Sequence, residues 1–207
     1  GEGEGEGEGE GEGEGEGESE GESEGEGEGE NTPEPEIRDE IEGLIDRGYA
    51  VLALDLRGHG ANEASSIGVA LQFDPEKGAP LDIEASLDWL KERQEVDPEK
   101  IGILGSSLGA NLVYLSMAQR LATAGVAISA RTQNIASLFG LDDLDGVTFG
   151  PVFCIASEKD GGGKLADTCS AANGATDAPK KVEILEGSED HGLSILVNHP
   201  TVWAMIL

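Results

Sequence analysis

The sequence predicts an α/β fold, in which a mainly parallel sheet carries helices on both of its faces. Short apolar runs of strand length alternate with segments whose apolar residues recur at helical spacing. This alternation is typical of strand–helix–strand units, and strands that are buried on both faces are apolar throughout. The expected strands are residues 49–54, 101–104, 125–129, 152–156 and 182–185.

Helical segments fill the intervals between these strands. From Ile37 onward, isoleucine and leucine residues share one face of a helix that ends at Arg47-Gly48, a cation followed by a glycine cap. Residues 61–80 contain two prolines and many polar side chains and are expected to be irregular. Further helices are expected at residues 82–94, 107–122 and 193–207, with a brief helix or loop at 136–144 and weak helical character at 164–173.

Residues 1–30 alternate glycine with glutamate, interrupted only by Ser19 and Ser23. The tract has no apolar side chain, so charge repulsion and the backbone entropy of glycine predict a disordered segment. It holds 15 of the 43 acidic residues, and the formal net charge of −30 therefore divides equally between the tract and residues 31–207. A proline-containing linker follows. The chain is thus expected to comprise a low-complexity segment over residues 1–35 and one domain over residues 36–207.

Charge and hydropathy exclude several classes of protein. The acidity opposes binding to nucleic acid, and no apolar run reaches membrane-spanning length. The N-terminal tract has neither the basic nor the apolar region of a targeting signal. Cys154 lies in an apolar run and is expected to be a buried free thiol, with a single bridge to Cys169 as the alternative. These features assign neither a compartment nor an oligomeric state.

The most informative stretch is residues 101–110, where an apolar strand runs into Gly105-Ser106-Ser107-Leu108-Gly109 and a helix follows. A serine on a sharp turn between a strand and a helix stands clear of the fold, where a base can reach its hydroxyl. The flanking glycines are expected to let the strand and the helix approach closely. The N–H of Leu108 lies at the helix start, where backbone donors favour an anion.

Two further residues complete a chemically matched set. Asp160 and His191 follow two later strands, so that all three residues lie just past strand ends, where ligands bind in such sheets. A histidine can take the serine proton near neutral pH, and a carboxylate fixes its tautomer and stabilises its charged form. The sequence therefore predicts a triad of Ser107, His191 and Asp160.

These motifs resemble those of the α/β-hydrolase superfamily, in particular its esterase and dienelactone-hydrolase-like branches. The resemblance spans about residues 36–200 and is carried by the Asp-x-Arg-Gly-x-Gly loop within 47–60, the elbow around Ser107, and the loops at 157–160 and 187–192. It implies that Ser107 is the nucleophile, Asp160 the acid, His191 the base and the Leu108 N–H one oxyanion donor. Because dienelactone hydrolases proper use cysteine as the nucleophile, the serine points to ester hydrolysis. Residues 61–80 are short for a lid, so a small acyl or ester substrate is expected, and no cofactor is implied because the chemistry needs only side chains and water.

Other polar residues near these motifs are weaker candidates. His59 is expected to belong to a structural loop, and His199, which precedes Pro200, to serve at the surface or in packing. Asp190 is adjacent to His191, but neighbouring side chains seldom orient each other as a triad requires. Glu158 is the next alternative for the acid, whereas Asp55 is expected to act as a cap or to pair with Arg57. Ser106 shares the elbow, but Ser107 holds the middle position of the motif. No cluster of histidine, cysteine and carboxylate residues has metal-ligand spacing.

The chain departs from the family pattern on its N-terminal side. A complete α/β hydrolase has further strands before the helix near Ile37, and one of them carries a loop with the second oxyanion donor. The Gly/Glu tract occupies this length, so the sequence predicts an N-terminally incomplete sheet with an unpaired apolar edge near residues 49–54. Two functions therefore compete. The first is hydrolysis of an ester or related acyl bond through an acyl-enzyme on Ser107; the alternative is a non-catalytic, truncated or artificial hydrolase-like domain that lacks a complete oxyanion hole.

Overall fold

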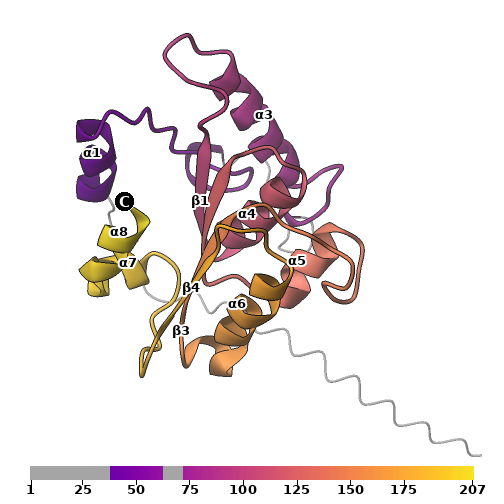
Figure 1. Ribbon diagram of the computed structural model, residues 1–207. Helices are drawn as coiled ribbons and strands as arrows, with labels where there is room; N and C mark the ends of the chain where they lie inside the picture. The colour runs from indigo at the N-terminus through magenta and orange to yellow at the C-terminus, as the bar shows by residue number, and fades with distance from the viewer. Residues whose placement is uncertain (1–37, 63–71) are drawn as a thin grey trace, which may run out of the picture. The chain divides into compact units, whose positions relative to one another are not determined.

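The computed structural model describes residues 38–62 and 72–207 (Figure 1). Its centre is a sheet of four parallel strands in the order β1-β2-β3-β4, which span Gly102–Ser106, Ala124–Ile128, Val152–Ser157 and Lys181–Leu185. Four of the five expected strands are present, and the predicted α/β fold with a parallel sheet is confirmed. The Gly/Glu tract and linker lie outside the described residues, so the disorder and the domain boundary stay predictions.

Helices cover both faces of this sheet. Successive strand residues point to opposite sides and therefore contact different helices. Ala127 and Cys154 lie in one buried cluster with side chains of α4 (Leu108–Ala118), α5 (Thr132–Leu138) and α6 (Lys164–Gly174). Ile128 and Ile155 lie in a second cluster with side chains of α7 (Ser194–Asn198) and α8 (Pro200–Ile206). A third cluster packs α3 (Pro80–Lys91) against α4.

The register of the strands brings their carboxyl ends to one edge of the sheet. Ser106, the last residue of β1, pairs with Ile128, the last residue of β2. Ile128 in turn pairs with Ile155, two residues before the end of β3. The loops that follow the four strands therefore emerge together, and they carry the candidate site.

Cys154 and Cys169 form a disulfide, so the expectation of a buried free thiol is wrong and the alternative of a single bridge holds. The reason is the packing of α6 on β3. Cys154 points to the face that α6 covers, and the Cα atoms of the two cysteines lie 5.4 Å apart, within the range that a bridge requires. Both residues are buried.

The segment 49–54 forms no strand, which contradicts the sequence prediction. It follows α1 (Arg38–Asp46), and its large apolar side chains are exposed, with Tyr49 at 57% and Leu54 at 41%. A strand is stable only when a neighbour takes up its backbone N–H and C=O groups. Among residues 38–62 and 72–207 no strand pairs with this segment. In the strand order β1-β2-β3-β4, β1 is therefore an edge strand.

The remaining differences concern helix ends. The expected helix 193–207 is two short helices, α7 and α8, because Pro200 has no N–H to donate and restricts the residue before it. Helix α5 begins earlier than the expected segment 136–144. Residues 60–62 form the short helix η1 (Gly60–Asn62), and part of the expected irregular stretch 61–80 lies outside the described residues. Within the described part of the chain, no helix is long and apolar enough to cross a membrane.

Candidate active site

Ser107 lies on the sharp turn between β1 and α4, in a strained backbone conformation. Its φ of 50° and ψ of −115° are rare for a residue with a side chain. Three hydrogen bonds hold this peptide. The Ser107 N–H donates to Ile128 O at 2.9 Å, and Ser107 O accepts from the Ala110 N–H at 3.1 Å and from Asn111 Nδ2 at 2.9 Å. The turn is thus fixed to both β2 and α4.

The close approach of β1 to α4 explains one of the two flanking glycines. A Cβ on Gly105 would lie 2.3 Å from Gly109 O and 2.4 Å from Gly109 C, so that no side chain fits there. A Cβ on Gly109 would meet nothing within 4 Å. The expected reason for Gly105 is confirmed, whereas the same reason given for Gly109 is wrong.

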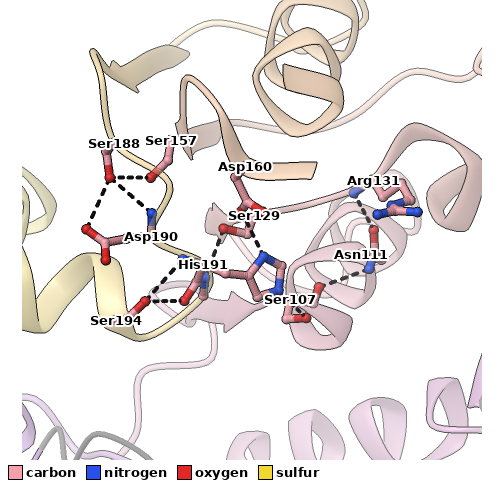
Figure 2. A network of polar contacts seen from close by, with 11 residues as sticks. Ser107, Asn111, Ser129, Arg131, Ser157, Asp160, Ser188, Asp190, His191 and Ser194 are labelled. Carbon is pink, nitrogen blue, oxygen red and sulfur yellow. Dashed lines mark hydrogen bonds and ion pairs between the residues drawn. The ribbon is translucent and has the colours of Figure 1, made fainter. Parts of the chain in front are cut away.

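Ser107, His191 and Asp160 lie in a hydrogen-bonded row (Figure 2). His191 Nε2 is 2.8 Å from Ser107 Oγ, and His191 Nδ1 is 2.7 Å from Asp160 Oδ2. The Asp160 side chain is 10% exposed and that of His191 is 49% exposed, so the carboxylate is shielded while the imidazole faces solvent. If Nδ1 carries the ring proton and donates it to Asp160, Nε2 is free to accept the proton of Ser107.

A model of the α/β hydrolase family matches residues 36–177. The chain belongs to this family. It is 30% identical over 156 residues to the uncharacterized protein YfhR of Salmonella typhi, a match that covers 73% of this chain and 48% of that protein. The chain therefore spans about half the length of the curated relatives it matches.

Solved structures show the same fold. The esterase Pf2001 of Pyrococcus furiosus superposes with a TM-score of 0.58 at 21% identity, over 80% of this chain and 70% of that one. Acetyl xylan esterase 1 of Thermoanaerobacterium sp. superposes with a TM-score of 0.50 at 16% identity, over 75% of this chain and 64% of that one. At these identities the likeness concerns the α/β-hydrolase fold alone.

The loop that carries His191 is fixed by residues that sequence reasoning missed. The buried Ser129, at the end of β2, accepts a hydrogen bond at its Oγ from the Gly192 N–H at 3.0 Å. Ser129 has a φ of 62°. On the other side of His191, Ser194 Oγ accepts from the His191 N–H at 3.1 Å and donates to His191 O at 2.6 Å. The imidazole is therefore held at both ends of its short loop.

Asn111 joins the elbow to the loop after β2 and was also missed. It is 1% exposed; its Nδ2 donates to Ser107 O at 2.9 Å, and its Oδ1 accepts from the Arg131 N–H at 2.9 Å. Both residues had a signal in the sequence. Ser129 lies just past the end of a strand, which is the same position that singled out Asp160. Asn111 is a polar residue inside an otherwise apolar helix, where a buried polar side chain needs hydrogen-bond partners.

Asp190 hydrogen-bonds to His199 and Asn198 and not to the ring of its neighbour His191. Its Oδ2 is 2.8 Å from His199 Nε2, and its Oδ1 accepts from Asn198 Nδ2 at 2.8 Å. These hydrogen bonds hold the pKa of the Asp190 carboxyl below its usual value. Ser188 Oγ donates to Asp190 Oδ2 and accepts from Ser157, which ties this group to the end of β3 (Figure 2). Asp190 and His199 thus fix the shape of the loop before His191.

The other candidate residues make contacts outside the row of Ser107, His191 and Asp160. Glu158 Oε2 accepts from the Gly187 N–H at 2.6 Å, and His59 is exposed with Nδ1 3.2 Å from Arg57 O. His191 bonds to Ser107 and not to Ser106. In the described residues no group of three or more histidine, cysteine, aspartate or glutamate side chains could hold a metal ion.

Arg57 pairs with Asp82 of α3. Its Nη2 is 2.6 Å from Asp82 Oδ1, and its Nε donates to the same carboxylate. Burial raises the pKa of the Asp82 carboxyl, but the hydrogen bonds from Arg57 outweigh this effect and leave the pKa below its usual value. The pair anchors the loop after residues 49–56 to α3.

Proposed function

We propose that the protein is a serine hydrolase that cleaves a carboxylic ester or related acyl bond through an acyl-enzyme on Ser107. The observation that carries the proposal is the continuous row from Ser107 Oγ through His191 to Asp160, with separations of 2.8 and 2.7 Å. Membership of the α/β hydrolase family and the strained turn at Ser107 support it. The chemistry requires only side chains and water.

In acylation, Ser107 Oγ attacks the acyl carbonyl carbon while its proton passes to His191 Nε2. Asp160 stabilises the imidazolium through the hydrogen bond donated by Nδ1. The oxyanion of the tetrahedral intermediate lies at the start of α4, where the Leu108 N–H donates to it. The intermediate collapses when His191 returns the proton to the departing alkoxide, which leaves as the alcohol.

In deacylation, water takes the place of the alcohol. His191 Nε2 removes a proton from the water as it attacks the Ser107 ester, and then returns this proton to Ser107 Oγ as the acyl–oxygen bond breaks. The products are a carboxylic acid and the free serine. The half-exposed imidazole of His191 favours a small, accessible acyl substrate.

The proposal is tested by the hydrolysis of p-nitrophenyl acetate and butyrate, followed through the release of p-nitrophenol. We expect turnover by the full chain, and a loss of about 10³-fold or more in Ser107→Ala. Ser106→Ala is the matched control, because it removes a hydroxyl from the residue next to Ser107, and His191 bonds to Ser107 instead of Ser106. Equal rates in the Ser107 variant and the full chain would contradict the proposal.

The competing candidate is a non-catalytic hydrolase-like domain. One observation favours it: residues 49–54 lie exposed and outside the sheet, so the first strand expected in this chain is not formed. In the family, the second oxyanion donor comes from a loop that precedes this part of the chain. Losing one such donor typically lowers turnover by about 10²–10³-fold. A folded protein that fails to hydrolyse either ester would favour this candidate.

A further inference from the structure

Arg131 has no partner for its side chain in the described part of the chain, although it is half-buried. This is unusual in a protein with 43 acidic and 13 basic residues. Every other arginine whose side chain the structure describes makes a contact through its guanidinium group: Arg47 with Gly43 O, Arg57 with Asp82, Arg93 with Trp89 and Glu92, and Arg120 with Asp177.

The position of Arg131 is fixed from the candidate active site. Its backbone N–H donates to Asn111 Oδ1 at 2.9 Å, and the same Asn111 side chain donates to Ser107 O. Its Nη2 lies 3.6 Å from the point that a Cβ on Gly161 would occupy, next to Asp160. The guanidinium group therefore lies over the carboxyl ends of β2 and β3, where the triad also lies.

The side chain stands apart from the catalytic row. In Figure 2 it lies beside Asn111, whereas Ser107, His191 and Asp160 form a separate line. The Asp160 carboxylate is already engaged by His191 at 2.7 Å, and the contact from Arg131 to Asn111 uses only the backbone. Among the described residues, the guanidinium group thus makes no hydrogen bond or ion pair that its loss would disturb.

We propose that Arg131 binds a carboxylate on the substrate, so that the preferred substrates are esters whose acyl part carries a second, anionic end. This inference rests on the proposed function, in which Ser107 attacks the acyl carbonyl. A guanidinium group binds a carboxylate through two parallel hydrogen bonds, and such charge-assisted bonds are stronger than neutral ones. Arg131 would hold the far end of the acyl chain while its carbonyl reaches Ser107.

The test compares two esters that differ only in this charge: mono-p-nitrophenyl adipate and its methyl-capped diester, assayed for p-nitrophenol release. We expect kcat/KM of the full chain to be about 10- to 100-fold higher for the anionic ester. Arg131→Met should abolish this preference, mainly through a higher KM, and change kcat/KM for the capped ester by less than about 3-fold. Arg131→Lys should retain part of the preference, because it keeps the charge without the planar group.

Lys159→Met is the matched control, since it removes one exposed positive charge from the residue before Asp160 and should leave the preference unchanged. Equal kcat/KM for the two esters in the full chain would overturn the inference, as would an equal loss on both esters in Arg131→Met. Labelling of Ser107 by a fluorophosphonate separates the two proposals. Labelling without a preference overturns only the role of Arg131, whereas no labelling and no turnover overturn the proposed function and the inference with it.

Discussion

At the scale of single residues, the candidate site depends on how Ser107 and His191 are held. The strained conformation at Ser107 costs about 1–3 kcal/mol and persists only where surrounding contacts determine it. The hydrogen bonds from Asn111 and to Ile128 supply these contacts. Ser129 likewise holds the loop of His191 by accepting a hydrogen bond from the Gly192 N–H. The two reacting groups are therefore positioned by buried side chains that take no part in the chemistry.

The choice of Asp160 as the acid leads to a first prediction. Asp160→Asn should lower kcat by about 10⁴-fold, because an amide that donates to Nδ1 forces the imidazole into the wrong tautomer. The protein should stay folded, since the side chain keeps its size. Steady-state hydrolysis of p-nitrophenyl acetate measures the effect.

Asp190→Asn is the control for this prediction, because Asp190 bonds to His199 and Asn198 and not to the His191 ring. We expect its kcat to remain within about 10-fold of the full chain. A larger loss of kcat in Asp190→Asn than in Asp160→Asn would show that the acid has been assigned to the wrong residue.

Ser129 gives a second prediction. Ser129→Ala removes the acceptor of the Gly192 N–H and leaves that buried donor unpaired, which should destabilise the protein by about 1–3 kcal/mol. Because the His191 loop loses a fixed point, kcat should also fall while KM stays unchanged. Ser137→Ala, which removes an exposed hydroxyl that bonds to its own helix, is the control and should change neither quantity. An unchanged kcat in folded Ser129→Ala would leave Ser129 with a purely structural role.

At the scale of elements, the contact between β1 and α4 determines where Ser107 stands. Gly105 approaches the backbone of Gly109 so closely that a methyl group there would have to separate the strand from the helix. The elbow therefore requires a glycine on its strand side, whereas the helix side has open space.

This asymmetry gives a third prediction. Gly105→Ala should lower the free energy of unfolding by about 3 kcal/mol or more, because the clash is with backbone atoms that cannot rotate away. Gly109→Ala should leave stability unchanged or raise it by up to about 1 kcal/mol, because alanine favours the helix over glycine. Urea denaturation of the two variants measures both values. Equal destabilisation would mean that the strand and the helix do not approach as described.

The elements also show how much the sequence could predict. Strands β1 to β4 could be predicted because each contains a short apolar run of strand length. Only the central strands β2 and β3 are largely buried, whereas the edge strands β1 and β4 are partly exposed. Residues 49–54 have the same pattern but form no strand, since strand formation depends on a pairing partner that a local pattern does not reveal. The disulfide between Cys154 and Cys169 depends in the same way on the packing of α6 against β3.

The candidate site, like the fold, could be predicted only in part from the sequence. Ser107, Asp160 and His191 could be chosen from a motif and from their places after strands, and the structure brings these three together. Asn111 and Arg131 belong to no motif. Their significance comes from the hydrogen bonds by which Asn111, on α4, connects Ser107 at the end of β1 with Arg131 in the loop after β2.

At the scale of the whole molecule, acidity governs the response to pH. Asp82 and Asp190 both have pKa values below the usual carboxyl range, because each accepts hydrogen bonds in the folded state. A carboxyl whose pKa is lower in the folded than in the unfolded state stabilises the fold above its unfolded pKa of about 3.9. This contribution is lost as the pH falls through the folded-state pKa.

A fourth prediction follows from this linkage. Asp82→Asn should be less stable than the full chain near neutral pH, by about 1–3 kcal/mol, since it loses the charged bonds to Arg57. The difference should narrow as the pH falls below about 4, where the Asp82 carboxyl becomes protonated first in the unfolded chain and then, at lower pH, in the folded protein. Urea midpoints measured from about pH 7 to about pH 3 test this. A difference that stays constant over this range would show that the charge of Asp82 contributes nothing.

The central claim is that Ser107 is an activated nucleophile, and the most direct test is intact-mass spectrometry after incubation with a fluorophosphonate. The probe reports an activated serine without requiring the natural substrate. We expect one adduct on the full chain, none on Ser107→Ala, and strongly slowed labelling in His191→Ala. No adduct on a protein whose circular dichroism shows it to be folded would contradict the claim and leave a hydrolase fold without its chemistry.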